Sequence, residues 1–182
     1  MQAHEMEAVV DTQRESEARL LAMVHGLTEE QWRFREAPER WSIAENVEHL
    51  VLFERFIRDA VERALTGDAA NEERRAEVRA KTTLVAELAK ARDQQRFTAR
   101  AVTTPTGRRT DFDAMVAEFR RERAQTISFT RQVATADLHG HFFAHTVFGD
   151  LDAYQWLMLL ATHVDRHILQ IKQVKADKNW PR

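Results

Sequence analysis

The 182-residue chain has no cysteine, only five glycines and three prolines, and a net charge of −2. Without cysteine it can form no disulfide, supply no thiolate to a metal and use no thiol nucleophile of its own. The scarcity of glycine and proline, beside abundant alanine, leucine, glutamate and arginine, is typical of helical proteins. Acidic and basic residues are interspersed, which argues against a basic nucleic-acid face or a polybasic membrane anchor.

Long apolar runs are also missing. The longest, near Tyr154–Thr162, is too short to span a bilayer. The first residues lack the basic and apolar segments of a signal peptide. We therefore expect a soluble, cytoplasmic protein with neither membrane nor nucleic-acid partners. Its length fits a single domain over residues 1–182.

Apolar residues recur at steps of three and four in four long segments, as in amphipathic helices. Ser42 and Glu45 form a capping box at the start of the clearest segment, and Asp111 and either Asp150 or Asp152 can cap the last two. The segments are 3–26, 42–66, 111–135 and a fourth that begins at 150 or 152 and ends near 175. This pattern predicts an all-α four-helix bundle with a long connection between the second and third helices.

The connections are less regular. Residues 68–82 are highly charged and predict a linker or a short solvated helix, while 83–100 show a weaker helical pattern. Residues 103–107 and 138–149 are expected to be a loop and an irregular, histidine-rich connection. The connection between the second and third helices crosses the bundle end or covers one mouth of it. Three arginines of the third helix are expected to face outward: Arg120, Arg121 and Arg123.

His163 and His167 are four residues apart in the last helix and therefore lie on one face. His49, in the second helix, is the best candidate for a third ligand. Three imidazoles can bind zinc at about 2.0–2.1 Å and leave one position open. Nickel, iron, cobalt or manganese also suit imidazole ligands. The alternative is that each histidine is a core-edge residue bonded to a carbonyl group.

Other residues are weaker candidates. His139, His141 and His145 are more typical of a surface loop, although His145 is retained as a residue that could line the site. Gln170 could orient a ligand imidazole, whereas Glu45 is assigned to the capping box. The HExxH motif of zinc proteases is absent, so no carboxylate is assigned as general base. Three arginines could receive a carboxylate of the substrate: Arg120, Arg123 and Arg166.

Four segments, in order, resemble the DinB/YfiT-like superfamily. Residues 41–50 (WSIAENVEHL) resemble its W-S-x-x-E-x-x-x-H-L motif, and 104–107 (TPTG) resemble the loop before the third helix in the YfiT-like branch. Residues 145–151 (HTVFGDL) resemble H-P-x-F-G-x-L, with Thr146 in the place of the usual proline. Residues 163–171 (HVDRHILQI) resemble the closing H-x-x-R-H-x-x-Q-I motif.

The resemblance implies an up-down-down-up four-helix bundle, a homodimer, and a divalent metal held by His49, His163 and His167. Zinc and nickel are the first expectations, with iron, cobalt and manganese as alternatives. Some relatives are S-transferases or isomerases that use a low-molecular-weight thiol, and others were proposed as hydrolases. We therefore expect a metal-dependent enzyme that activates a small thiol or water for attack on a small-molecule electrophile. The alternatives are a non-catalytic, metal-binding or structural dimeric bundle and a metal-free helical interaction module.

Overall fold

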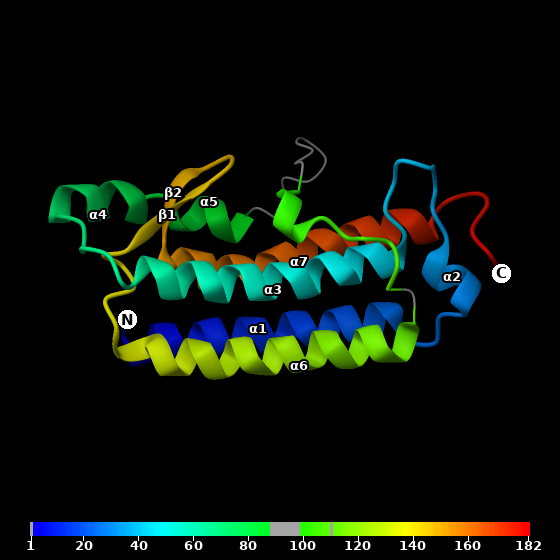
Figure 1. Cartoon of the computed structure of the whole chain (residues 1–182), viewed down its shortest axis with the longest axis horizontal. Helices are drawn as coiled ribbons and strands as arrows, with labels where there is room; N and C mark the ends of the chain where they lie inside the picture. Colours follow the sequence, from blue (N-terminus) through cyan, green and yellow to red (C-terminus); the bar gives the residue numbers. More distant parts are fainter. Residues whose placement is uncertain (1, 88–98, 110) are drawn as a thin grey trace.

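The computed structural model describes residues 2–87, 99–109 and 111–182. Its main body is a bundle of four long helices: α1 (Ala3–Val24), α3 (Ile43–Ala64), α6 (Phe112–Gln132) and α7 (Ala153–Lys175). Both α1 and α3 pack against α6 and α7. Along the bundle, α1 and α7 run in one direction, and α3 and α6 run in the other (Figure 1). The fold is therefore the up-down-down-up bundle that the sequence predicts.

Shorter elements connect these helices. The chain between α3 and α6 contains α4, α5 and the 3₁₀ turn η2, and a second 3₁₀ turn, η3, follows α6. The bounds are α2 (Glu29–Arg33), α4 (Glu72–Arg79), α5 (Thr82–Glu87), η2 (Ala101–Thr103) and η3 (Val133–Thr135). The short solvated helix expected in 68–82 is α4. The helix expected over 83–100 is described only as α5, because residues 88–98 lie outside the described residues.

The predicted caps explain where the long helices begin. Ser42 Oγ accepts a hydrogen bond from the Glu45 backbone N–H at 3.2 Å, and Glu45 Oε2 accepts one from the Ser42 N–H at 2.8 Å. At the start of α7 the cap is Asp152, whose Oδ1 accepts from the Gln155 N–H at 2.6 Å. Asp111 caps α6 in the same way. These bonds satisfy backbone donors that helix starts leave free, so they fix where α3, α6 and α7 begin. The site histidines lie on α3 and α7.

The prediction of an irregular connection over 138–149 was wrong in part. Strands β1 (Phe142–His145) and β2 (Gly149–Asp152) pair antiparallel, with His145 opposite Gly149. Gly149 has φ of +65°, a conformation that glycine adopts without the strain a side chain would cause. Strands of four residues are too short for a clear alternation of apolar and polar residues, which is why the sequence pattern did not reveal the hairpin.

The core consists of two apolar clusters, one toward each end of the bundle. The first includes Leu20, Leu50 and Ile171, and the second includes Val9, Ile57 and Leu160. On the long helices, buried polar residues lie near the boundary between the two clusters. On α1, α3 and α6 these buried residues are Gln13, Ser16, Glu54, Arg123 and Thr126. A polar layer therefore crosses the bundle near the middle of its length.

Arg123 does not face outward as expected. Its side chain is fully buried, with Nη2 2.6 Å from Glu54 Oε1, and Nη1 donates to the Gln13 carbonyl at 3.2 Å. Arg120 and Arg121 are exposed, as predicted. Helical spacing placed Arg123 on the inner face, but an arginine is rarely fully buried unless it has a charged partner. That partner lies on another helix, so the local sequence could not identify it.

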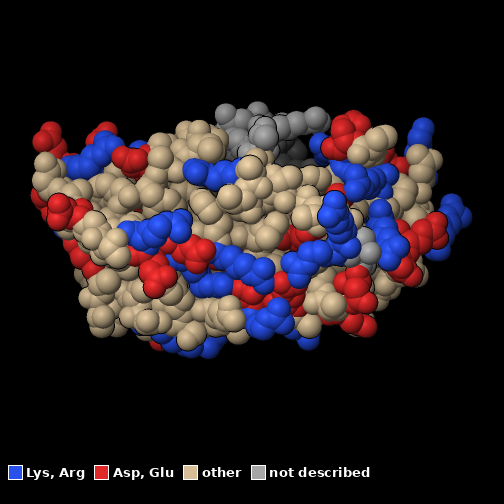
Figure 2. Space-filling model, in the orientation of Figure 1, with Lys and Arg blue, Asp and Glu red and all other residues tan. Residues whose placement is uncertain are grey.

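Charged side chains also bridge α3 and α6 at the surface. Arg55 lies 2.6 Å from Glu118, and Arg58 lies 2.5 Å from Glu122. Figure 2 shows basic (blue) and acidic (red) side chains interspersed along the face of the bundle where the two helices lie. Within the described residues, no helix is both long and apolar enough to cross a membrane.

The buried pair gives a test of the polar layer. Replacing Arg123 by Met leaves the Glu54 carboxylate buried without its cation, so we expect the free energy of unfolding to fall by about 3–5 kcal/mol. The double variant Arg123→Met, Glu54→Met removes both charges and should recover much of the loss. Urea unfolding measures both, with the exposed Arg121→Met as control. A double variant no more stable than the single one would contradict this account.

His139 links the start of α7 to α1. Its Nδ1 lies 3.0 Å from Asp152 Oδ2, and its Nε2 lies 3.4 Å from Glu5 Oε1. The hydrogen bond to Asp152 raises the pKa of His139 above its ordinary value, although partial burial opposes the shift. The His139 ring therefore binds its proton more strongly in the folded protein than in the unfolded chain.

Because folding raises this pKa, the protonated His139 stabilises the folded state. The full contribution is present below the unfolded pKa of about 6.5, and it is lost as the pH rises through the folded pKa. We therefore expect His139→Gln to reduce the fall in the free energy of unfolding between about pH 6.5 and 8. Urea unfolding at a series of pH values measures this slope. The exposed His25→Gln is the control, and equal slopes in all three proteins would refute the prediction.

Candidate metal centre

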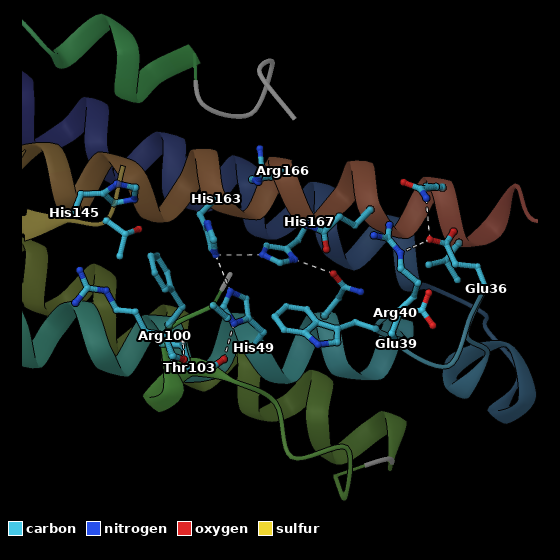
Figure 3. Close-up of a pocket in the computed structure, with 18 of the residues that line it drawn as sticks. Glu36, Glu39, Arg40, His49, Arg100, Thr103, His145, His163, Arg166 and His167 are labelled. Atoms are coloured by element: carbon cyan, nitrogen blue, oxygen red, sulfur yellow. Dashed lines mark hydrogen bonds and ion pairs between the residues drawn. The ribbon is translucent and has the colours of Figure 1, made fainter. Parts of the chain in front are cut away.

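Three histidines meet between α3 and α7, one on α3 and two on α7. Nε2 of His163 lies 2.9 Å from Nε2 of His49 and 3.2 Å from Nε2 of His167. All three ring nitrogens lie within 4.8 Å of one another, and Figure 3 shows the rings pointing toward a common point. The four-residue spacing on α7 brings two of the rings together. The antiparallel packing of α3 brings the third.

Carbonyl oxygens set the orientation of two rings. Nδ1 of His49 donates to the carbonyl of Thr103 at 2.6 Å, and Nδ1 of His167 donates to Oδ1 of Asn46 at 2.8 Å. The Asn46 amide is itself fixed, because its Nδ2 donates to the Ser42 carbonyl at 2.8 Å. Since these oxygens only accept hydrogen bonds, both Nδ1 atoms carry the proton. In the neutral rings each Nε2 therefore has a lone pair directed at the meeting point.

Burial favours the neutral form of these histidines. It lowers the pKa of His49 to about 4, despite the opposing effect of the hydrogen bond to Thr103. Burial likewise lowers the pKa of His163 well below its ordinary value, and the nearby His49, Arg166 and His145 lower it further. Neutral imidazole is the form that binds a metal ion.

The spacing of the three nitrogens suits a metal ion. In a tetrahedral zinc site with bonds of about 2.0–2.1 Å, ligand nitrogens lie about 3.3–3.4 Å apart. The two closest separations here are 2.9 and 3.2 Å. Lone pairs at such distances repel unless a proton or a cation lies between them. The donor set and its geometry therefore fit a divalent cation with three protein ligands.

Aromatic rings support the cluster from two sides. The Trp41 ring is nearly parallel to His167, with an interplanar angle of 13° and centroids 6.1 Å apart. Phe53 stacks on His163 at 26° and 4.1 Å. These contacts restrict the rotation of both imidazoles. The open side of the cluster faces a cavity of about 390 Å³.

The cavity separates the candidate residues into those at the site and those away from it. His145, Arg166 and Gln170 line it. Asn46 has the orienting role expected of Gln170, and Glu45 is the capping residue, as predicted. Other candidates are placed elsewhere among the described residues: Arg120 is exposed, Arg123 is in the core, and His139 and His141 are outside the cavity lining.

The Thr103 carbonyl depends on a loop that is bound to α3. Glu48, which precedes His49, is buried; its Oε1 accepts from Thr106 Oγ1 at 2.8 Å and its Oε2 from the Gly107 N–H at 3.2 Å. Gly107 has φ of +68°. This support was not predicted, because the oxygen that His49 binds belongs to the backbone of Thr103 and leaves no side-chain signal in the sequence.

Comparisons with known proteins agree with this fold. The family model described as the DinB superfamily matches residues 13–171. Among curated proteins, none matches the sequence significantly.

One solved structure with a similar fold is YfiT from Bacillus subtilis, described as a probable metal-dependent hydrolase with an unusual four-helix bundle topology. It is 15% identical to this chain with a TM-score of 0.61, over 100% of this chain and 91% of YfiT. At this level of identity the similarity supports the fold alone.

Gly107 tests whether the loop positions His49. A Cβ at this residue would lie 3.0 Å from Glu45 Oε1 and 3.4 Å from Arg35 Nη2. We expect Gly107→Ala to displace the Thr103 carbonyl and lower the affinity for zinc by about 10–100-fold. Titration against a competing chelator measures this affinity.

Gly26→Ala is the matched control. Gly26 has φ of +72°, and a Cβ at this residue would have no neighbouring atom within 4 Å. Alanine there meets backbone strain of about 1–2 kcal/mol without a steric contact. It should lower stability while leaving zinc affinity unchanged. Equal zinc affinities in the two variants would show that the loop does not position His49.

Proposed function

The chain belongs to the DinB superfamily, and on that premise we propose that it is a metal-dependent enzyme whose divalent cation is held by His49, His163 and His167. The observation that carries the proposal is the convergence of their Nε2 atoms, two of them separated from His163 by 2.9 and 3.2 Å, at the wall of a cavity. Imidazole ligands favour zinc or nickel here, and also accommodate iron, cobalt or manganese.

The proposed reaction is attack by a small thiol or water on a small-molecule electrophile. A divalent cation with three protein ligands keeps a position open and lowers the pKa of a thiol or water bound there. The description of YfiT as a probable metal-dependent hydrolase supports water. A thiol would have to come from a co-substrate, because the chain has no cysteine.

The protein orients the ligand rings and covers part of the cluster. Thr103 and Asn46 hold two ligand rings in the tautomer that presents Nε2. Trp41 and Phe53 cover two sides of the cluster and leave the cavity as the approach for a substrate. The cavity is within the range of small-molecule sites, which favours an enzyme over a purely structural metal bundle. The cytoplasmic location, single domain and homodimer remain predictions.

Metal content tests the proposal directly. Elemental analysis of tag-free protein should find about one divalent metal ion per chain. His49→Ala and His167→Ala each leave two ligands, so both variants should lose it. His145→Ala, which changes a cavity histidine outside the cluster, should retain it. Stoichiometric metal in His167→Ala, or no metal in the parent protein after incubation with zinc and nickel, would disprove the assignment.

A further inference from the structure

The cavity extends along α7 on both sides of the histidine cluster. Its lining on this helix runs from Trp156 to Val174. At a rise of about 1.5 Å per residue, Trp156 lies about 10 Å before the first of the two cluster histidines on α7. Figure 3 shows His145 and Arg100 on one side of the cluster and Arg40 on the other. The cavity therefore has two ends, and a molecule bound at the cluster can extend toward either of them.

The end at Arg40 has an excess of negative charge. Glu36 Oε1 accepts a hydrogen bond from Arg40 Nε at 2.6 Å, and Glu39 lies at the same end (Figure 3). Within the described residues that line the cavity, Glu36 and Glu39 are the only carboxylates. Two carboxylates beside one guanidinium group leave one negative charge unbalanced. This end therefore favours a cationic group of a ligand over an anionic one.

The opposite end presents a cation. The Arg100 Nη2 atom donates to the Ala144 carbonyl at 2.6 Å, and the guanidinium lies over the Phe56 ring, with Cζ 5.3 Å from the ring centroid. Neither contact neutralises Arg100, because a carbonyl group and an aromatic ring carry no net charge. The described lining at this end contains no carboxylate. An anionic group of a ligand is therefore favoured here.

His145 contributes a second hydrogen-bond donor to this end. Its Nδ1 accepts from the backbone N–H groups of Val147 and Phe148, at 3.1 and 3.3 Å. Because Nδ1 is an acceptor, the proton of the neutral ring is on Nε2. Burial lowers the pKa of His145 to about 4, with a further contribution from Arg100, so the ring is neutral near pH 7. Phe148 stacks on the ring, with centroids 4.8 Å apart, which restricts its rotation.

The two donors lie close together. Arg100 binds the carbonyl of Ala144, the residue directly before His145. The His145 ring also contacts the ring of Trp156, with centroids 5.2 Å apart, and both residues line the cavity that contains the histidine cluster. A guanidinium group and an imidazole N–H group therefore meet at one end of the cavity, within the length of a small molecule from the cluster.

From this arrangement we infer that Arg100 and His145 bind a carboxylate of the substrate, whose electrophilic carbon lies between that carboxylate and the histidine cluster. The Arg100 guanidinium supplies the opposite charge, and the His145 Nε2–H group donates to a carboxylate oxygen. The inference rests on the proposed function and specifies its substrate class, a small carboxylic acid. The negative charge at the Arg40 end disfavours the reverse orientation.

The test uses hydroxamic acids, which bind a metal ion through two oxygens. Acetohydroxamic acid measures binding to the metal alone. The monohydroxamic acids of succinic, glutaric and adipic acid add a carboxylate about 4–6 Å away when extended, and their terminal primary amides are neutral analogues. Calorimetric titration into zinc-loaded protein gives each affinity. We expect at least one carboxylate to bind about 10-fold more tightly than its amide, as a charge-assisted hydrogen bond implies.

Variants of Arg100 assign this preference to its charge. Arg100→Gln should abolish the preference for the carboxylate, and Arg100→Lys, which keeps the charge, should retain part of it. Both variants keep the Arg100 backbone carbonyl, which accepts from Thr103 Oγ1 at 3.1 Å, so acetohydroxamic acid should bind to them as to the parent protein. Arg33→Gln is the control, because Arg33 pairs with Glu29 outside the cavity lining.

His145 should show a different pattern. Its N–H group can donate to a carboxylate oxygen or to the oxygen of the amide analogue. His145→Phe should therefore weaken both probes, by about 3–10-fold, and leave acetohydroxamic acid unaffected. Unchanged affinities of both probes in this variant would remove His145 from the inferred site.

The remaining outcomes separate this inference from the proposed function. Equal affinities of every carboxylate and its amide, with acetohydroxamic acid bound, would overturn the inference and leave the metal centre intact. A preference that survives in Arg100→Gln would also overturn it, and loss of that preference in Arg40→Gln would place the carboxylate at the other end. If the protein binds neither metal nor any hydroxamic acid, the proposed function is rejected, and this inference with it.

Discussion

A neutral imidazole has one N–H group to satisfy, and two rings of this site satisfy it with carbonyl oxygens behind them. The bonds from His49 to Thr103 and from His167 to Asn46 turn both lone pairs toward His163. Other parts of the structure serve this arrangement. Glu48 and Gly107 hold the loop that supplies one oxygen, and the Ser42 carbonyl fixes the amide that supplies the other. Orientation of the ligands is thus a property of several elements, not of the histidines alone.

The need to satisfy buried polar groups also explains why the site lies near the boundary between the two apolar clusters. Polar groups are costly to bury without partners, so they are best gathered where they can bond to one another. Gln13, Glu54 and Arg123 form such a group within the bundle. On α7, His163 lies between residues of the two clusters, and His49 meets it from α3. The apolar ends stabilise the helices, and the middle is available for polar chemistry.

Sequence reasoning succeeded where a feature depends on neighbours along one helix. The spacing of His163 and His167, the Ser42–Glu45 capping box and the apolar stripes all have this character. Sequence reasoning failed where the partner is distant in the chain. Arg123 was predicted to face outward, but it is buried beside Glu54 of another helix. The carbonyl of Thr103 could not be found at all, since every residue has one and only the fold brings this one to His49. The hairpin was missed because its strands are short.

The order of the helices has a consequence for biosynthesis. α7 follows the other three long helices in the chain, yet it packs against both α1 and α3 and carries two of the three histidines. During synthesis from the N-terminus, the nascent chain can form local helices but not this bundle until α7 has left the ribosome. Until then the chain holds only one of the three ligands, His49. A cation can therefore bind all three histidines only after α7 has been synthesised and has packed against α3.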